Sequence, residues 1–419
     1  MSETTYENPD VLNQDPYELP LEDLNVAQGE LFQNDSHWAY FERLRNEAPV
    51  HYCRDSEFGP YWSVTKYSDI KYVDTHDEIF SSEPTIVLGD QEEDFELEMF
   101  IAMDSPKHDQ QRKEVAPVVA SRNLSALEPT IRTRVCSILD SLPLEETFDW
   151  VNRVSIELTT QMLATLFDFP YEDRHKLTRW SDVATAAPEP GGIIETEDER
   201  QAELLECLEY FTNLWNERIN QPPGNDLVSM LAHGEATKNM QPMEYLGNLV
   251  LLIVGGNDTT RNSISGGVLA LNQYPDEYQK LRDNPSLIPN MVSEIIRWQT
   301  PLAYMRRVAL KDTELGGQQI KAGDKIAMWY VSGNRDPEMF DDPDAFIIDR
   351  PNARKHIAFG FGIHRCMGNR VAEMQLRILW EEILERFHSV ELVGEPVRVK
   401  SPFVKGYLEL PVQLHARSA

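Results

Sequence analysis

The fold of this chain is decided by residues 359–370, which read FGFGIHRCMGNR and set one cysteine among three glycines and two phenylalanines. Gly360 and Gly362 suit a tight turn, and Gly368 allows a flat ligand or another backbone segment to approach closely. The residues that follow repeat apolar side chains at helical spacing, which predicts an amphipathic helix. The pattern therefore predicts Cys366 at a helix N-terminus, where the helix dipole stabilises a thiolate. A buried, inert cysteine is the alternative.

The composition is that of a globular enzyme. The chain has 419 residues, 41% hydrophobic and 26% charged, which is enough to enclose a cofactor. No linker-like or repetitive segment divides it, so we expect an acidic N-terminal extension over residues 1–34 and one domain over 35–419. The N-terminus has neither a signal-peptide pattern nor an apolar span, which favours a cytoplasmic protein. The four cysteines form no CxxC pair, so neither a disulfide framework nor a zinc site is indicated.

Charge is distributed unevenly along the chain. The formal net charge of −31 argues against nucleic acid as a partner, because binding to phosphates requires a basic face. Around the cysteine, however, basic residues outnumber acidic ones: Arg350, Arg354, Lys355, His356, His364, Arg365, Arg370 and Arg377. A basic region on an acidic protein predicts an acidic docking partner.

Helical periodicity dominates, and the sequence predicts a mainly α protein with a small β portion. A helix is expected from Asp35 or Ser36 to just before Pro49, and mostly helices over 107–300, with a polar loop and helix start at 188–200. Strand patterns occur at 50–53, 61–65, 306–310 and 326–331, and again in the C-terminal tail.

The longest predicted helix begins near Pro242 and runs for about thirty residues, apolar almost all round in its first half, as expected of a buried helix. Within it, residues 255–260 read GGNDTT. Thr259 lies four residues after Gly255, so its hydroxyl can reach that carbonyl and open a polar notch, into which Asp258 could pass protons. A kink at a glycine pair, where another helix packs closely, is the alternative.

Two further groups of charged residues are spaced as helix neighbours. Glu294 and Arg297 share one helix face, and Arg350 could complete a buried cluster with a structural role. His108 and Arg112 also share a face, and together with Arg307 and His364 could clamp two carboxylates. A solvated helix face is the plainer interpretation of the second group.

These motifs together resemble a known family. The sequence FGFGIHRCMG is similar to the heme-binding loop FxxGxxxCxG of the cytochromes P-450, and the spacing matches at Phe359, Gly362, Cys366 and Gly368. GGNDT resembles the oxygen-activation helix of that family, and EIIR its ExxR helix, in the same order along the chain. The resemblance implies the mainly α cytochrome P-450 fold, with heme b between the long helix and the cysteine loop.

The resemblance also implies roles for individual residues. Cys366 would be the axial thiolate ligand of the heme iron, next to the loop residues Phe359 and Gly360, while Asp258 and Thr259 would supply protons for oxygen activation. The heme propionates would be held by His108, Arg112, Arg307 and His364. Glu294, Arg297 and Arg350 would form the structural cluster.

The implied reaction inserts one oxygen atom from O2 into an unactivated C–H bond. IRWQTPLAYMRR and MWYVSGNRD resemble a soluble bacterial branch that hydroxylates the terminal carbon of medium-chain n-alkanes and fatty acids. The implied substrate walls are apolar, as an aliphatic substrate requires: Val87, Leu88, Leu251, Val254, Gly255, Leu302, Ala303, Met305 and Phe403. For a fatty acid, Arg174, His175, Lys176 or Arg179 could hold the carboxylate, although a solvated helix face is the simpler interpretation.

No flavin or nicotinamide fingerprint is present, so electrons must come from a partner. The resemblance implies a ferredoxin and a ferredoxin reductase, with NAD(P)H as ultimate donor. Hydroxylation of a terpenoid or other compact hydrophobe is an alternative function. A heme gas sensor is another, although it has no need of the Asp258 and Thr259 proton relay. A thiol enzyme without heme lacks a suitable base.

Overall fold

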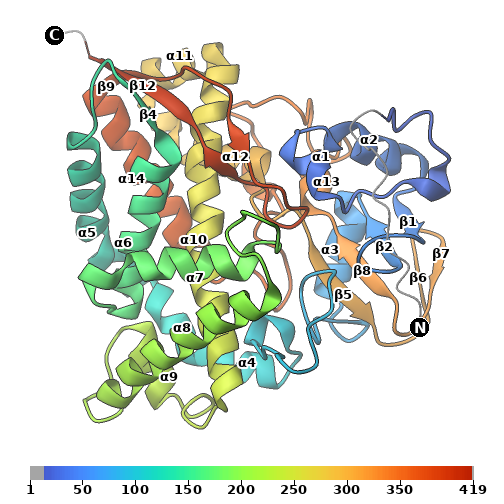
Figure 1. Ribbon diagram of the computed structural model, residues 1–419. Coiled ribbons are helices and arrows are strands. Elements are labelled where there is room, and N and C mark those ends of the chain that lie inside the picture. Colours follow the sequence, from blue (N-terminus) through green and yellow to red (C-terminus); the bar gives the residue numbers. More distant parts are fainter. Residues whose placement is uncertain (1–13, 418–419) are drawn as a thin grey trace.

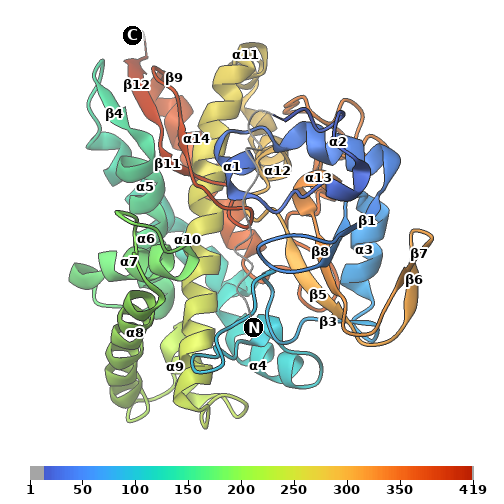
Figure 2. The ribbon, with the colours of Figure 1, turned by 45° about the vertical axis from the view of Figure 1, so that its right-hand side comes forward.

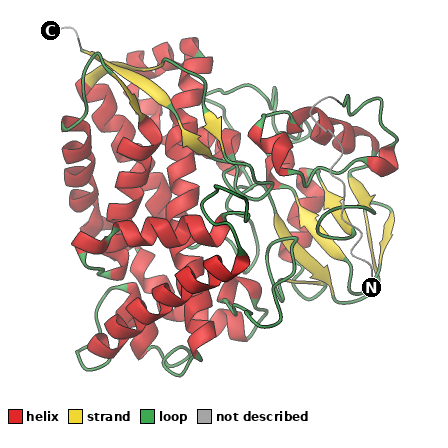
Figure 3. Ribbon diagram, viewed as in Figure 1, coloured by secondary structure: helices red, strands yellow, loops and turns green. Residues whose placement is uncertain are grey.

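The structure is a computed structural model that describes residues 14–417. A helix-rich part and a smaller β-rich part pack side by side (Figure 1), and the division is clear when the elements are coloured by type (Figure 3). The helical part contains α4 (Lys107–Val115), α5 (Ser121–Asp140), α6 (Glu157–Phe167), α7 (His175–Thr185), α8 (Glu197–Arg218), α9 (Leu227–His233), α10 (Pro242–Gln273), α11 (Pro275–Asp283), α12 (Ile288–Gln299) and α14 (Asn369–Arg386).

The β-rich part is built on a five-stranded sheet. Its strands lie in the order β1 (Val50–Cys53), β2 (Tyr61–Val64), β8 (Lys325–Met328), β5 (Met305–Ala309) and β3 (Phe80–Ser81). Only the β2 and β8 pair is parallel. Around the sheet lie α1 (Gly29–Gln33), α2 (His37–Glu47), α3 (Tyr67–Thr75), α13 (Tyr330–Gly333) and the hairpin of β6 (Thr313–Leu315) and β7 (Gln318–Ile320).

Two small sheets complete the chain. One pairs β4 (Thr147–Asp149), β12 (Pro411–Ala416) and β9 (Phe387–Leu392), and the other pairs β10 (Val397–Arg398) with β11 (Tyr407–Glu409). Single helical turns connect the larger elements, among them η3 (Phe100–Ala102) and η8 (Ala353–Lys355). The predicted mainly α architecture with a small β portion is confirmed.

The long helix α10 crosses the helical part from end to end (Figure 2). It has 32 residues, or about 48 Å at about 1.5 Å per residue, and it begins at Pro242 as the sequence predicts. Neighbours contact it on several sides, including α6, α7, α12 and α14. This enclosure explains its apolar composition, and it fixes the polar residues of the helix centre against particular partners.

The strand prediction for 326–331 is partly wrong. The strand β8 ends at Met328, and Tyr330 begins the short helix α13. The Trp329 amide still donates to the carbonyl of Val64 in the neighbouring strand, at 3.0 Å, but the Gly333 amide then turns back to the Trp329 carbonyl, also at 3.0 Å. A short apolar run that is buried on every side satisfies a strand and a helix equally, so its periodicity could not locate this change.

The charged cluster predicted around Glu294 forms. Its carboxylate accepts from Arg297, at 2.8 Å through Nε, and from Arg350, at 3.0 Å, and all three side chains are buried. The two guanidinium groups also donate to backbone carbonyls between residues 334 and 345. The cluster therefore fastens this otherwise irregular segment to α12, close to the loop that carries Cys366.

The boundary expected at residue 34 stays a prediction, and residues 1–13 of the expected extension lie outside the described residues. Leu24, Leu31 and Phe32 are buried in one cluster with Tyr40 and Phe41 of α2. The described end of this segment is therefore packed into the β-rich part. Within residues 14–417, no helix is long and apolar enough to cross a membrane.

Candidate active site

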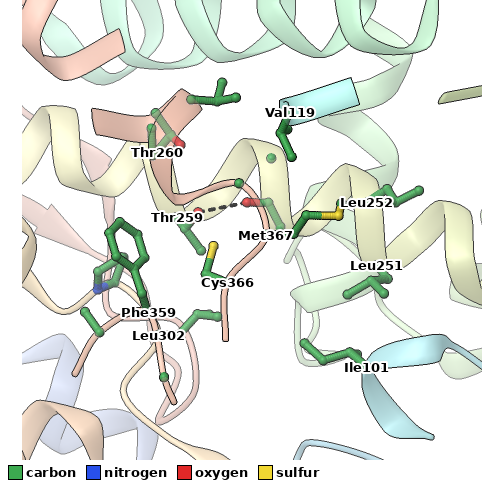
Figure 4. A pocket seen from close by; sticks show the side chains of 18 of the residues that line it. Ile101, Val119, Leu251, Leu252, Thr259, Thr260, Leu302, Phe359, Cys366 and Met367 are labelled. Atoms are coloured by element: carbon green, nitrogen blue, oxygen red, sulfur yellow. Dashed lines mark hydrogen bonds between the residues drawn. The ribbon is translucent and has the colours of Figure 1, made fainter. Parts of the chain in front are cut away.

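A deep cavity lies between the centre of α10 and the loop that precedes α14 (Figure 4). Thr259, Leu251 and Leu252 face it from α10, and Cys366 and Met367 face it from the loop. Two segments more than a hundred residues apart thus form opposite walls. The cavity is mostly apolar, and polar residues line it on both walls: Thr259, Thr260 and Ser263 from α10, and His364 and Cys366 from the loop.

The cysteine loop is held in a tight turn. Gly360 and Gly362 both adopt a φ of 64°, a left-handed conformation that favours glycine. The turn closes when the amide of Cys366 donates to the carbonyl of Phe359 at 2.8 Å. The first residue of α14 is Asn369, so Cys366 stands just before the helix and not within its first turn.

The thiol of Cys366 faces the cavity. Burial by the surrounding protein raises the pKa of this thiol. The backbone N–H groups of Gly368 and Asn369 and the cations of Arg112 and Arg365 act in the opposite direction. In the protein alone, desolvation outweighs these groups and favours the thiol form.

The notch predicted in α10 is present. Thr259 Oγ1 donates to the Gly255 carbonyl at 2.8 Å (Figure 4). A Cβ added at Gly255 would meet no atom within 4 Å, so this side of the helix opens directly into the cavity. At Gly256, by contrast, an added Cβ would lie 2.6 Å from Leu163 Cδ2 of α6. The two glycines therefore differ, since the first opens a space and the second admits a neighbouring helix.

Asp258 does not line the cavity, so the expectation that it stands beside the notch needs correction. Its buried carboxylate pairs with Arg261 at 2.5 Å, and Arg261 also pairs with Asp182 of α7 at 2.8 Å. The Thr185 hydroxyl of α7 donates to the Asp258 carboxylate at 3.4 Å. Adjacent helix residues differ in direction by about 100°, which turns Asp258 toward α7 while Thr259 faces the cavity. Burial raises the pKa of Asp258, with Arg261 opposing.

Three of the four predicted propionate-holding residues line the cavity: Arg112, Arg307 and His364. The fourth, His108, is buried behind His364, with the two ring centroids 4.2 Å apart. Burial, reinforced by the nearby Arg307, lowers the pKa of His364 to about 2, and burial also lowers the pKa of His108. Both imidazoles are therefore neutral at pH 7, and the two arginines carry the positive charge.

These polar groups fit a ligand that carries carboxylates. Among residues 14–417, His108 Nε2 and both ring nitrogens of His364 are buried without a hydrogen-bond partner. Buried polar atoms in proteins almost always have hydrogen-bond partners. The unpartnered imidazole nitrogens therefore mark a place where a ligand could accept a hydrogen bond. A sulfur on one wall, with neutral imidazoles and arginines at the edge, matches a flat metal-containing group that carries anionic substituents.

The structure brings only part of the expected substrate wall to the cavity. Leu251, Gly255, Leu302 and Met305 line it. The other five do not: Val87, Leu88, Val254, Ala303 and Phe403.

Neighbouring packing accounts for these five positions. Leu88, Ala303 and Phe403 belong to the core of the β-rich part, Val254 packs into the core of the helical part, and the Val87 carbonyl accepts from Arg306. Ala303 follows Leu302 in extended backbone, where successive side chains point in opposite directions.

Several lining residues escaped the sequence reasoning. They come from η3, from the turn before α5, from α6 and from α10: Ile101, Val119, Leu163, Leu166, Leu252 and Thr260. The sequence could have indicated Leu252 and Thr260, because each follows directly after a residue of the helix face formed by Leu251, Gly255 and Thr259. The others lie on elements whose approach to α10 depends on tertiary packing, which no local pattern indicates.

The basic surface is smaller than the sequence suggests. Arg350 and His356 are buried, His364 faces the cavity, and Arg377 pairs with Glu128 and Glu381. The remaining members are exposed and enter no ion pair within residues 14–417: Arg354, Lys355, Arg365 and Arg370. Arg354 and Lys355 belong to η8, and Arg365 and Arg370 lie on either side of Cys366 in the sequence.

Comparisons with known proteins agree with this site. The family model described as Cytochrome P-450 matches residues 194–406. The chain is 36% identical over 388 residues to linalool 8-monooxygenase of Pseudomonas putida, covering 89% of this chain and 94% of that protein. It is 32% identical to the methyl-branched lipid omega-hydroxylase of Mycobacterium tuberculosis, over 95% of this chain and 96% of that protein.

A solved structure extends the likeness to three dimensions. Cytochrome P-450-153 from Novosphingobium aromaticivorans superposes with a TM-score of 0.88 at 48% identity, covering 93% of this chain and 99% of that one. The chain therefore belongs to the cytochrome P-450 family and is a heme-thiolate monooxygenase. Its cofactor is heme b, as in the rest of the family.

Proposed function

We propose that this protein hydroxylates the terminal carbon of a medium-chain aliphatic compound, and an n-alkane in preference to a fatty acid. The apolar wall opposite Cys366 carries this proposal: Ile101, Val119, Leu251 and Leu252 present only hydrocarbon to the cavity (Figure 4). An aliphatic chain gains free energy by burial against such a wall without leaving a polar group unpaired. The similarity to an omega-hydroxylase of lipids supports attack at a chain end.

The charges of the structure favour an uncharged substrate. The cations that might hold a fatty-acid carboxylate each pair with a glutamate: Arg174 and His175 with Glu157, Lys176 with Glu206, and Arg179 with Glu203. The two arginines of the cavity lie on the side of the cysteine loop, where we propose that they bind the heme. A buried fatty-acid carboxylate would thus find none of these cations free within residues 14–417, which makes its burial costly.

We propose that Cys366 would hold the heme iron through its thiolate and that Arg112, Arg307, His108 and His364 would hold the heme carboxylates. Phe359 and Gly360 line the cavity beside the sulfur. Bound heme b supplies the activation of O2 and the insertion of one oxygen atom into a C–H bond. The protein contributes a dry wall, a fixed sulfur and a controlled supply of protons.

We propose that Thr259 positions the proton that oxygen activation consumes. Its hydroxyl lies on the face of α10 that lines the cavity, and its hydrogen bond to the Gly255 carbonyl orients it. Asp258 can relay protons only when its pair with Arg261 opens, because the carboxylate is turned toward α7. Asp182, which is 27% exposed, connects this pair to the surface. This route gives the cavity protons without admitting bulk water.

A second candidate function is hydroxylation of a terpenoid. The similarity to linalool 8-monooxygenase favours it, and an apolar wall accepts either class of compound. A gas sensor remains the weaker alternative, because it would have no use for the Thr259 hydroxyl. For electron supply we propose a ferredoxin with its NAD(P)H-dependent reductase, docked on the basic residues outside the cysteine loop. A cytoplasmic location stays an expectation from the sequence.

A spectroscopic titration of the holoenzyme tests the substrate class. An alkane, the primary alcohol and the fatty acid of the same chain length are compared with monocyclic and bicyclic terpenes, and the substrate-induced shift of the Soret band is followed. We expect the alkane and the alcohol to bind at least about tenfold more tightly than the acid, a difference of about 1.4 kcal/mol. Shifts with cyclic terpenes alone would reject the linear substrate.

A further inference from the structure

A buried carboxylate stands directly behind one of the two cavity arginines. Asp74, in the last turn of α3, is 4% exposed, and its Oδ1 accepts from Arg307 Nη2 at 2.9 Å. Arg307 Nη1 donates to the carbonyl of Arg306, also at 2.9 Å. The guanidinium group is therefore fixed from behind while its residue lines the cavity.

The second oxygen of Asp74 holds two other elements. Oδ2 accepts from the Phe361 amide at 2.6 Å and from the Tyr330 hydroxyl at 3.0 Å. One carboxylate thus joins α3, β5, α13 and the cysteine loop. Burial raises the pKa of Asp74, and Arg307 is the strongest of the groups that oppose this effect. Because Arg307 is a cation and the Phe361 amide can only donate, these contacts stabilise the ionised carboxylate.

The glycines of the cysteine loop are shaped to this residue. A Cβ at Gly362 would lie 2.2 Å from the Asp74 carbonyl oxygen, and one at Gly360 would lie 3.1 Å from Asp74 Oδ2. The loop that carries Cys366 therefore folds directly over the end of α3. Its permissive backbone serves contact with Asp74 as well as contact with the cavity.

The two arginines of the cavity are electrostatically unequal. Arg112 enters no ion pair within the described residues 14–417, whereas Arg307 shares its charge with Asp74. The nearby imidazoles of His108 and His364 are neutral, so they do not alter this difference. Arg307 is therefore in direct contact with a carboxylate, whereas the nearby carboxylate of Asp109 acts on Arg112 without forming an ion pair with it.

We propose that Asp74 is a positioning residue that holds Arg307 toward the cavity and lowers the reduction potential of the bound heme. The proposal rests on the proposed role of Arg307 in heme binding. Reduction adds one electron, so a fixed negative charge nearby disfavours the reduced state, and the low dielectric of the interior strengthens that effect. The negative charge of Asp74 also partly cancels the positive electrostatic potential that Arg307 produces at the cofactor.

The test compares Asp74→Asn with matched variants of the holoenzyme by spectroelectrochemical titration. Asp74→Asn removes the charge and keeps the size, so we expect a positive shift of the reduction potential. Asp74→Glu keeps the negative charge, so its reduction potential should lie closer to the wild-type value than that of Asp74→Asn. Asp69→Asn removes the same charge from the same helix without a contact to Arg307, and its shift should be smaller. Tyr330→Phe removes a hydrogen bond but no charge, and should leave the potential nearly unchanged.

If Asp74 had a purely structural role, Asp74→Asn would unfold at a lower urea concentration, and its heme reduction potential would stay at the wild-type value. A folded Asp74→Asn protein with the wild-type potential overturns the proposal, and so does an Asp74→Asn chain that fails to fold. Equal shifts in Asp74→Asn and Asp69→Asn also overturn it, since they would reflect net charge alone. The carbon-monoxide band of reduced wild-type protein, absent in Cys366→Ala, tests heme ligation separately, so either idea can fail without the other.

Discussion

Thr259 and Asp258 are neighbours in the chain, yet they serve different surroundings. The hydroxyl of Thr259 faces the cavity and the carboxylate of Asp258 faces α7. This separation keeps a charged group out of an apolar chamber, where it would be strongly desolvated, while a proton source stays within reach. At the scale of single residues, activity depends on which side of α10 each polar group occupies.

The first prediction concerns Thr259. In Thr259→Ala the cavity loses its positioned hydroxyl, so we expect oxygen consumption to continue while product per electron falls by about tenfold or more, with the difference released as peroxide. Coupling is measured as product and peroxide formed per NAD(P)H oxidised. Thr259→Ser, which keeps the hydroxyl, is the control. Full coupling in Thr259→Ala would contradict the proposed role.

The second prediction uses the two adjacent glycines. Gly255→Ala places a methyl group in open space, so the protein should keep its stability or gain up to about 1 kcal/mol from helix propensity. The methyl group narrows the cavity, and bulky compounds should bind about 1–3 kcal/mol less well, or roughly 5- to 150-fold. Gly256→Ala is the matched comparison, because its methyl group meets Leu163 and should lower the unfolding temperature. Unchanged terpene affinity in Gly255→Ala would be inconsistent with an open wall there.

At the scale of elements, the site depends on how α12 and the loop after α13 are fastened. Glu294 holds Arg297 and Arg350, and both arginines donate to the backbone of residues 334–345. The backbone hydrogen bonds of this segment form local turns, such as Met339 to Asp336, so side chains must attach it to α12. The cluster thereby gives the chain before the cysteine loop a fixed course.

The third prediction follows from this cluster. In Glu294→Gln two buried guanidinium groups lose their counter-charge, which should cost about 3–5 kcal/mol of folding free energy and reduce heme content. Urea unfolding followed by circular dichroism, with heme measured in the same samples, checks this. Glu235→Gln removes a solvent-exposed pair with Lys238 and should have little effect. Equal resistance to urea in both variants would show that the cluster does not stabilise the fold.

At the scale of the whole molecule, the distribution of charge matters most. A protein of net charge −31 repels other acidic proteins, yet Arg354, Lys355, Arg365 and Arg370 remain exposed and unpaired among the described residues beside the cysteine loop. Arg365 directly precedes Cys366 in the chain, and Arg370 follows it by four residues. Complementary charge accelerates encounter and orients a partner more than it raises affinity.

The fourth prediction is that reduction by an acidic ferredoxin depends on salt. Because exposed charges are screened beyond about 10 Å at 0.1 M salt, the rate should fall several-fold between about 0.05 and 0.5 M. Stopped-flow reduction under carbon monoxide measures it. Lys355→Glu should slow the reaction at low salt, while Lys238→Glu, outside this surface, should not. A reduction rate that does not change with ionic strength would contradict electrostatic docking of the ferredoxin.

The sequence alone determined the features that depend on local rules. Helical period located α10 and α14, the glycine turn located Cys366, and spacings of three and four placed Glu294 with Arg297 and Thr259 with the Gly255 carbonyl. Helix geometry fixes these relations within a few residues, so a single chain segment contains the information.

Only the tertiary structure decided what each side chain faces. It turned Asp258 toward α7, ended β8 at Met328, moved Val87 and Ala303 away from the cavity and brought Ile101 into it. It also joined Asp74 to Arg307 across more than two hundred residues. Such contacts arise from the packing of distant elements, which side-chain volume and burial determine together, so no local pattern records them.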